Sequence, residues 1–234
     1  MNNTSPMPNQ IPLDLGHLSS QRREDFMIAP CNQDAVGWVD RWPDWPAPCL
    51  IIQGEAACGK KHLASIWSER SGAKEIPNED IGRLDADQIA AQSKHICIRH
   101  VDWLIGDRET ETVLFHLYNI FKEEGRSLLF TMRSSPATID FQIKDLASRL
   151  RAAPLVSIAP PDDHLLEQLL VKLFSDRQLS AGPEVLKYVL PRMPRSFESA
   201  KELVKKADEL ALSEKKPISI GLIRRVLQQM DDQF

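Results

Sequence analysis

The sequence lacks closely paired cysteines, a secretory signal and any apolar run long enough to cross a membrane. Its four cysteines form no C-x-x-C pair, so neither a zinc site nor a disulfide framework is expected, and we interpret them as reduced thiols. The polar N-terminus does not resemble a signal peptide. The missing apolar run argues against a membrane span or a membrane partner. Together these absences predict a cytoplasmic protein.

The sequence also lacks an excess of positive charge. It has 29 Lys and Arg against 33 Asp and Glu, a formal net charge of -4. Non-specific DNA binding through a broad surface requires the opposite balance, so we expect at most a local basic patch. The 234 residues, 42% hydrophobic and 26% charged, are typical of a globular protein with one large domain or a core plus a small lid.

The sequence does contain a strand, loop and helix pattern over residues 49–63. Gly54, Gly59 and Lys60 match the phosphate-loop spacing G-x-x-x-x-G-K-[ST]. Glycines let backbone N–H groups surround phosphate oxygens, the lysine reaches the outer phosphates, and the helix N-terminus favours an anion. The last position, where a hydroxyl would hold Mg²⁺, is Lys61. The motif therefore predicts a phosphate site that lacks a metal ligand.

Buried-type strands alternate with helices up to Pro160, and only helices follow. This order predicts an α/β fold, a parallel sheet covered on both faces, with a small all-α lid behind it. Ligands of such sheets bind beyond the carboxyl ends of the strands. The predicted strands are 49–53, 73–76, 95–98, 127–131 and 155–158, and the predicted lid helices are 162–176, 183–192, 195–212 and 218–230. We divide the chain into a tail (1–21), a core (22–160) and a lid (161–234).

The N-terminal tail contains one short apolar stretch, Gln10-Ile11-Pro12-Leu13-Asp14-Leu15. It has two interpretations: a strand that lies on the domain, or a peptide that docks in a groove of a partner. Gln10, Leu13 and Leu15 resemble the peptides by which bacterial proteins bind the replication sliding clamp, a glutamine followed by spaced aliphatic side chains.

Several stretches, in this order, resemble the AAA+ ATPases and in particular the bacterial replication initiator DnaA. A clamp-type peptide before a DnaA-like module, with no room for a helix-turn-helix domain, is similar to the Hda/HdaA family of regulatory inactivators of DnaA. Residues 10–16 and 41–46 resemble its alphaproteobacterial form. The stretches that resemble DnaA are 54–63, 115–119, 124–131, 145–150, 158–162 and 217–220.

The resemblance implies a mechanism. The protein would dock through Gln10, Leu13 and Leu15 on the DNA-loaded sliding clamp, the β subunit of DNA polymerase III. It would then present Arg149 as an arginine finger to ATP held by a neighbouring DnaA. DNA would be contacted only through the clamp, and the protein would activate its partner's ATPase without being an enzyme itself. The sequence leaves open whether the protein forms a homodimer. Arg151 is the alternative to Arg149 as the arginine finger.

The nucleotide site departs from the family pattern. Arg99 and His100 occupy the positions of the acidic residues that organise Mg²⁺ and water, and Asp102 lies further along the chain than an obvious replacement. With Lys61, these changes predict no Mg²⁺ site and no intrinsic hydrolysis. The sequence leaves open whether this site binds ADP or ATP or is empty. The resemblance implies that Thr131 is the sensor-1 residue and Arg195 the sensor-2 residue. The alternative interpretations are a simple strand-end hydroxyl for Thr131 and an exposed arginine at a helix start for Arg195.

Three alternatives to the regulator remain at the level of sequence. The chain could be an active ATPase or clamp-loader-like motor, which Lys61 and Arg99 argue against. It could be an adaptor that recruits DnaA to DNA, which the acidic composition argues against. It could also be a paralogue that binds the clamp and DnaA without inactivating activity.

Overall fold

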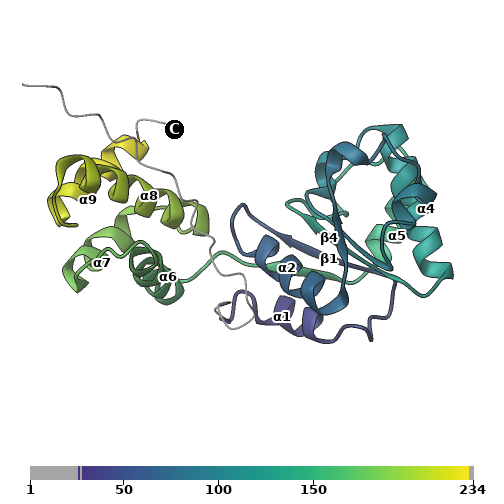
Figure 1. The fold of residues 1–234 in the computed structure, drawn as a ribbon, viewed down its shortest axis with the longest axis horizontal. Helices are drawn as coiled ribbons and strands as arrows, with labels where there is room; N and C mark the ends of the chain where they lie inside the picture. The colour runs from purple at the N-terminus through teal and green to yellow at the C-terminus, as the bar shows by residue number, and fades with distance from the viewer. Residues whose placement is uncertain (1–25, 27, 232–234) are drawn as a thin grey trace, which may run out of the picture.

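A computed structural model describes residue 26 and residues 28–231 (Figure 1). Its core is one sheet of five parallel strands in the order β2-β3-β4-β1-β5. The strands are β1 (Cys49–Gly54), β2 (Lys74–Ile76), β3 (His95–Ile98), β4 (Ser127–Met132) and β5 (Leu155–Ile158). The predicted parallel α/β fold and its five strands are confirmed.

Helices cover both faces of this sheet, which explains the continuous apolar character of its central strands. Leu50 and Ile52 of β1 pack on the face with α1 (Gln33–Asp40) and α2 (Lys60–Ser71). Ile51, between them, points to the opposite cluster, which includes residues of α3 (Ala86–Ala90), α4 (Arg108–Glu123) and α5 (Lys144–Ala152). All three side chains are fully buried.

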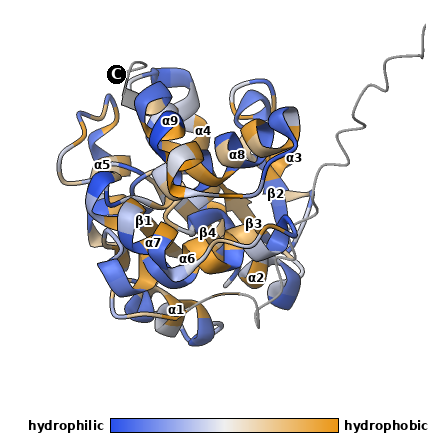
Figure 2. Cartoon of the chain, turned by 90° about the vertical axis from the view of Figure 1, so that its left-hand side faces the viewer, coloured by the Kyte–Doolittle hydropathy of each residue, from blue (hydrophilic) through white to orange (hydrophobic). Residues whose placement is uncertain are grey.

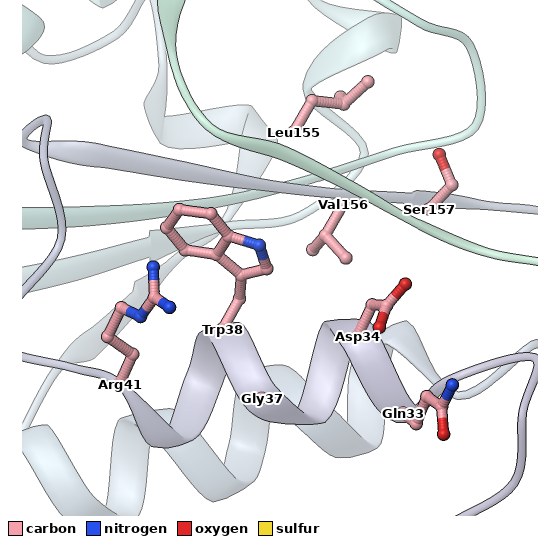
Figure 3. Close-up of a pocket in the computed structure, with 8 residues that line it drawn as sticks. All are labelled: Gln33, Asp34, Gly37, Trp38, Arg41, Leu155, Val156 and Ser157. Atoms are coloured by element: carbon pink, nitrogen blue, oxygen red, sulfur yellow. The ribbon is translucent and has the colours of Figure 1, made fainter.

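Strand β5, at one edge of the sheet, departs from this burial. Its residues alternate between exposed and buried, and Leu155 keeps 40% of its surface exposed. Helix α1 packs beside β5, and a groove of about 470 Å³ lies between them (Figure 3). This edge therefore combines a partly exposed strand with a groove of mixed apolar and polar lining.

The C-terminal part is entirely helical, as the sequence predicts. It consists of α6 (Asp163–Asp176), α7 (Pro183–Val189), a 3-10 turn (Leu190–Arg192), α8 (Phe197–Glu214) and α9 (Ile220–Asp231). These helices bury their apolar residues in a cluster of their own. Figure 2 shows apolar (orange) and polar (blue) residues alternating along the helices. Phe197, the first residue of α8, packs instead against the core cluster beside α1 and α2. Among the described residues, no helix combines the length and the apolar character that a membrane span requires.

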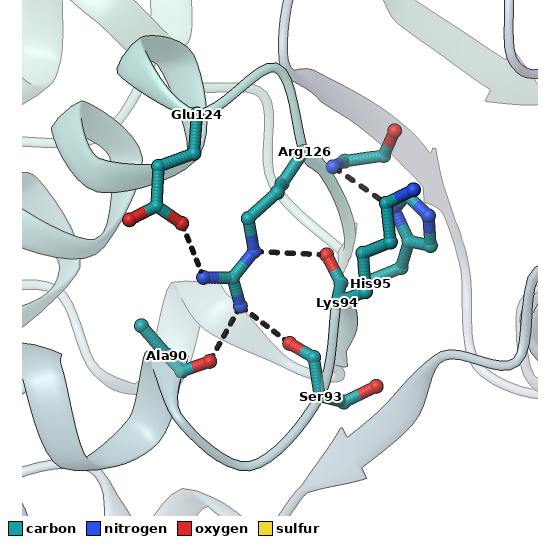
Figure 4. A network of polar contacts seen from close by, with 7 residues as sticks. Ala90, Ser93, Lys94, His95, Glu124 and Arg126 are labelled. Atoms are coloured by element: carbon teal, nitrogen blue, oxygen red, sulfur yellow. Dashed lines mark hydrogen bonds and ion pairs between the residues drawn. The ribbon is translucent and has the colours of Figure 1, made fainter.

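Arg126 holds the amino ends of β3 and β4 together (Figure 4). Its Nε donates to the carbonyl oxygen of Lys94 at 3.0 Å, and its Nη2 donates to the carbonyl oxygens of Ala90 and Ser93. Its guanidinium carbon lies 4.1 Å from the centre of the Phe121 ring. Arg126 thus joins the turn before β3 to the turn before β4, at the end of the sheet opposite to the phosphate loop.

Candidate functional site

The phosphate loop connects the carboxyl end of β1 to the first turn of α2. Gly54 is required by close packing, since a Cβ there would lie 2.6 Å from Cys58 Sγ and 3.0 Å from the Ile158 carbonyl oxygen. Gly59 precedes α2 with φ of +107°, a conformation that favours glycine. A Cβ at Gly59 would also lie 3.2 Å from the Phe26 ring. Both predicted glycines therefore shape the loop.

Lys60 is buried at the first position of α2 and points into its own loop. Its Nζ donates to the carbonyl oxygens of Gly54 at 2.6 Å and Glu55 at 2.7 Å, and lies 3.7 Å from Cys58 Sγ. Burial raises the pKa of the Cys58 thiol and outweighs the opposite effect of the nearby Lys60, so the thiol stays protonated. Lys61, the next residue of α2, is exposed. A phosphate at this helix end would have to compete with the two carbonyl oxygens for Lys60.

The segment after β3 places Arg99 and His100 in different surroundings. Arg99 forms an ion pair with Glu75 of β2, on the side of β3 away from β4 and the phosphate loop. His100 has φ of +54°, and its backbone N–H donates to Thr131 Oγ1 at 3.2 Å. Thr131 is buried, so its hydroxyl fixes the ends of β3 and β4 relative to each other.

His100 and Asp102 carry two buried atoms without a hydrogen-bond partner in the described chain, His100 Nδ1 and Asp102 Oδ1. The His100 ring stacks on the exposed Trp103 with centroids 4.5 Å apart, and burial, helped by Arg99, lowers its pKa. The other Asp102 oxygen accepts the backbone N–H of Arg133 at 3.0 Å. A carboxylate therefore lies at the ends of β3 and β4, where spacing along the sequence did not indicate one.

Arg149 of α5 lies against two aromatic rings of α4. Its guanidinium carbon is 5.0 Å from the centre of the Phe115 ring and 5.5 Å from that of Tyr118. Arg151 is bound differently, because its Nε donates to the Pro136 carbonyl oxygen at 3.0 Å. Arg151 thus holds the loop before α5. Helix α5 lies at the end of the core away from the lid (Figure 1), and it leads into the amino end of β5, whereas the phosphate loop follows the carboxyl end of β1.

Glu111 is a buried residue of this region that periodicity alone did not single out. It is fully buried in α4 and accepts backbone N–H groups from Gly106 at 2.9 Å, Gln142 at 3.0 Å and Ile143 at 2.7 Å. Ile143 immediately precedes α5. Glu111 therefore links the loop after β3 to the start of the helix that carries Arg149.

The remaining predicted residues do not join these groups. Arg195 pairs with Asp163 inside the lid at 3.0 Å, and both side chains are exposed. Gln10, Leu13 and Leu15 lie outside the described residues. Phe26, which the sequence did not indicate, contacts the phosphate loop: its ring packs edge-on against His62, with centroids 5.1 Å apart.

The donor set of the loop fits an anion better than a metal ion. Glycines that a Cβ would obstruct, a buried lysine and a helix start without an acidic residue are the chemistry of a phosphate site. Mg²⁺ prefers oxygen ligands, but Lys61 replaces the hydroxyl, and one Asp102 oxygen already accepts an N–H group. Within the described ranges, no three His, Cys, Asp or Glu side chains are grouped as metal ligands.

The sheet order, the loop after β1 and the helical lid define the AAA+-like α/β fold. No protein-family model matches the chain. The chain is similar to domain III of the Thermotoga maritima replication initiation protein DnaA, with a TM-score of 0.79 and 18% identity over 90% of this chain and 97% of that one.

Two further solved structures share the fold at low identity. AMPPCP-bound DnaA from Aquifex aeolicus matches with a TM-score of 0.68 and 17% identity, over 89% of this chain and 69% of that one. The Thermotoga maritima RuvB Holliday junction branch migration motor matches with a TM-score of 0.69 and 12% identity, over 91% and 72%. These likenesses establish the DnaA-like AAA+ fold.

Proposed function

We propose that this protein is a negative regulator of replication initiation that stimulates hydrolysis of ATP bound to DnaA. It docks through Gln10, Leu13 and Leu15 on the DNA-loaded sliding clamp and supplies Arg149 to the nucleotide of a neighbouring DnaA. The observation that carries the proposal is the setting of Arg149 on a DnaA-like fold: it lies against two aromatic rings of α4, on a helix that leads into the amino end of β5 and not into the phosphate loop.

The chemistry assigned to Arg149 is stabilisation of charge. A guanidinium that reaches the transferred phosphoryl group of a neighbour neutralises the negative charge that develops there. The rings of Phe115 and Tyr118 lie against the guanidinium group, and Glu111 accepts the Ile143 N–H just before the helix that carries it. In this proposal the protein donates no proton and binds no metal. The partner holds the ATP.

The protein's own loop has a different role in this proposal. Gly54, Gly59 and Lys60 hold the phosphates of ADP or ATP as a structural ligand at the start of α2. A bound nucleotide supplies negative charge that releases Lys60 from the two loop carbonyl oxygens. Since Lys61, Arg99 and His100 replace the groups expected to organise Mg²⁺ and water, the nucleotide is not turned over.

Hydrolysis of labelled ATP preloaded on the cognate DnaA tests the proposal, in the presence of DNA-loaded clamp. The wild-type chain is expected to stimulate hydrolysis, and Arg149→Ala to lower that stimulation by at least about 100-fold, the typical loss of one stabilising group. Arg83→Ala removes an exposed arginine from a turn before α3 and serves as the matched control. A run without DnaA measures hydrolysis by the chain itself.

The outcomes separate the candidates. Stimulation that survives Arg149→Ala contradicts the arginine-finger role. Clamp binding without stimulation by the wild-type chain favours the paralogue that lacks inactivating activity. Hydrolysis in the run without DnaA would instead favour an ATPase, with the Asp102 carboxylate as the first residue to replace.

A further inference from the structure

Strand β5 has one hydrogen-bonding side that no described strand pairs. The Pro154 carbonyl oxygen accepts the Ile51 N–H of β1 at 2.9 Å, whereas the Ala159 N–H donates to Cys31 on the other side at 2.9 Å. Backbone groups of a strand alternate in direction, so those of Leu155 and Ser157 face away from β1. This free edge offers N–H and C=O groups to an additional strand.

The groove below this edge is lined by both apolar and polar residues, with a charged side chain at each end (Figure 3). Trp38 of α1 turns its indole toward β5. Gly37 leaves open space, since a Cβ there would have no atom within 4 Å. The Arg41 guanidinium carbon lies 4.7 Å from the centre of the Trp38 ring at one end, and Asp34 lies at the other. In β-strand addition, the unpaired backbone of an edge strand binds the added segment, and a groove beside that edge takes some of its side chains.

We infer that residues 11–15 of this same chain bind there as a sixth strand. Ile11, Leu13 and Leu15 alternate with Pro12 and Asp14, so one face of the segment is apolar in an extended conformation. If the backbone groups of the three apolar residues pair with β5, Pro12 faces outward. Proline has no N–H and is compatible with a strand only at such an unpaired side.

The length of the connecting chain permits this arrangement. Cys31 is hydrogen-bonded at the carboxyl end of β5, so the chain enters the core beside the groove. Residues 16–25 span up to about 33 Å when extended. Strand β5 has four residues and measures only about 13 Å. The segment therefore reaches the edge in either strand direction.

The inference has a consequence that rests on the proposed function. Residues 10–15 are also the proposed clamp peptide, so the segment cannot pair with β5 and occupy the clamp at once. Docking on β5 would reduce the apparent clamp affinity by the fraction of molecules in which the segment is free. The chain would thereby restrain its own recruitment.

Amide hydrogen exchange of the full chain, resolved by NMR at single residues, tests the docking without the clamp. We expect the Leu155 and Ser157 amides to exchange at least about tenfold faster in an Ile11→Asp/Leu13→Asp variant than in the wild type. The Val156 amide, which faces β1, is the internal reference. Thr4→Asp is the matched control outside the segment. Equal exchange of Leu155 and Ser157 in wild type and variant overturns the inference, and protection that rises with protein concentration assigns the edge to a second copy.

A groove-filling variant tests the consequence separately. Gly37→Gln places a side chain in the open groove and also favours the helix, because glycine is a weak helix former. It should speed exchange at Leu155 and Ser157 as the tail variant does, and it should bind the clamp more tightly than wild type. Faster exchange without a gain in clamp affinity would contradict the clamp role of the peptide, while the sixth strand would stand.

Discussion

Lys60 is held by two carbonyl oxygens of its own loop, and this contact makes its role measurable. In a Lys60→Ala variant, we expect ADP affinity to fall by about 10- to 100-fold, because a hydrogen bond to a charged group contributes about 1.5–3 kcal/mol. Lys61→Ala, one residue along and exposed, should have a smaller effect. Titration calorimetry with ADP measures both. Equal affinities for wild type and Lys60→Ala would show that the lysine only closes the loop.

His95, at the opposite end of the sheet, makes stability depend on pH. Its Nδ1 accepts the Ser127 N–H at 3.1 Å, and burial, with Lys94 and Arg126, lowers its pKa below the usual 6.5. Between the folded pKa and 6.5, the unfolded chain binds more protons, so the free energy of unfolding falls as the pH drops through this window and levels off below it.

Replacing His95 with Gln should flatten this dependence. Urea unfolding at several pH values measures it, and His100, whose pKa is also lowered, should leave a residual slope. The exposed His116→Gln variant is the control for the substitution itself. A wild-type slope in the His95→Gln variant would assign the pH dependence to other groups.

Among single residues, the sequence predicted those that belong to a local motif and missed those whose hydrogen-bond partners lie far away in the sequence. Gly54, Gly59 and Lys60 were recognisable because the phosphate loop is one continuous stretch. Asp102 and Glu111 were not, since their partners Arg133, Gln142 and Ile143 follow about 30 residues later. Only the fold brings these N–H groups to the carboxylates.

At the scale of elements, α4 and α5 act as one unit because of Glu111. Replacing Glu111 with Ala would remove three hydrogen bonds to a fully buried carboxylate, and a hydrogen bond to a charged group contributes about 1.5–3 kcal/mol. We expect the free energy of unfolding to fall by about 3 kcal/mol or more, and by less for Glu111→Gln, which keeps an accepting oxygen. Denaturant unfolding measures both.

Glu123→Gln, exposed at the end of α4, is the matched control and should change stability by less than about 0.5 kcal/mol. If the link also positions Arg149, the Gln variant should lose stimulation of DnaA while remaining folded. Full stimulation in a Glu111→Gln variant would limit this residue to a role in stability.

The elements themselves were largely predictable, and their boundaries were less so. Continuous apolar runs identified the central strands β1, β3 and β4 because both sheet faces are covered there. Helix α8 was expected from 195 but begins at Phe197, where Ser196 Oγ accepts the Ser199 N–H at 3.0 Å. The helix expected over 183–192 ends as a 3-10 turn that contains Pro191. Local capping and proline geometry, not periodicity, set these ends.

At the scale of the whole molecule, the core and the lid have separate hydrophobic clusters. Leu203 is fully buried in the lid cluster, so Leu203→Ala should destabilise the lid by about 2–5 kcal/mol. Hydrogen exchange should increase in α6–α9, while β1 and β4 stay protected. Leu212→Ala, on the same helix but 67% exposed, is the control. Equal loss of protection in β1 and β4 would show that the chain unfolds as one cooperative unit.

The aromatic support of Arg149 has a consequence for the speed of encounter. A carboxylate partner would cancel the charge of a guanidinium, whereas the rings of Phe115 and Tyr118 hold the group and leave its full positive charge. Such a charge attracts an anionic surface before contact, over a range set by the ionic strength. A rise in salt would therefore slow association more than it would speed release.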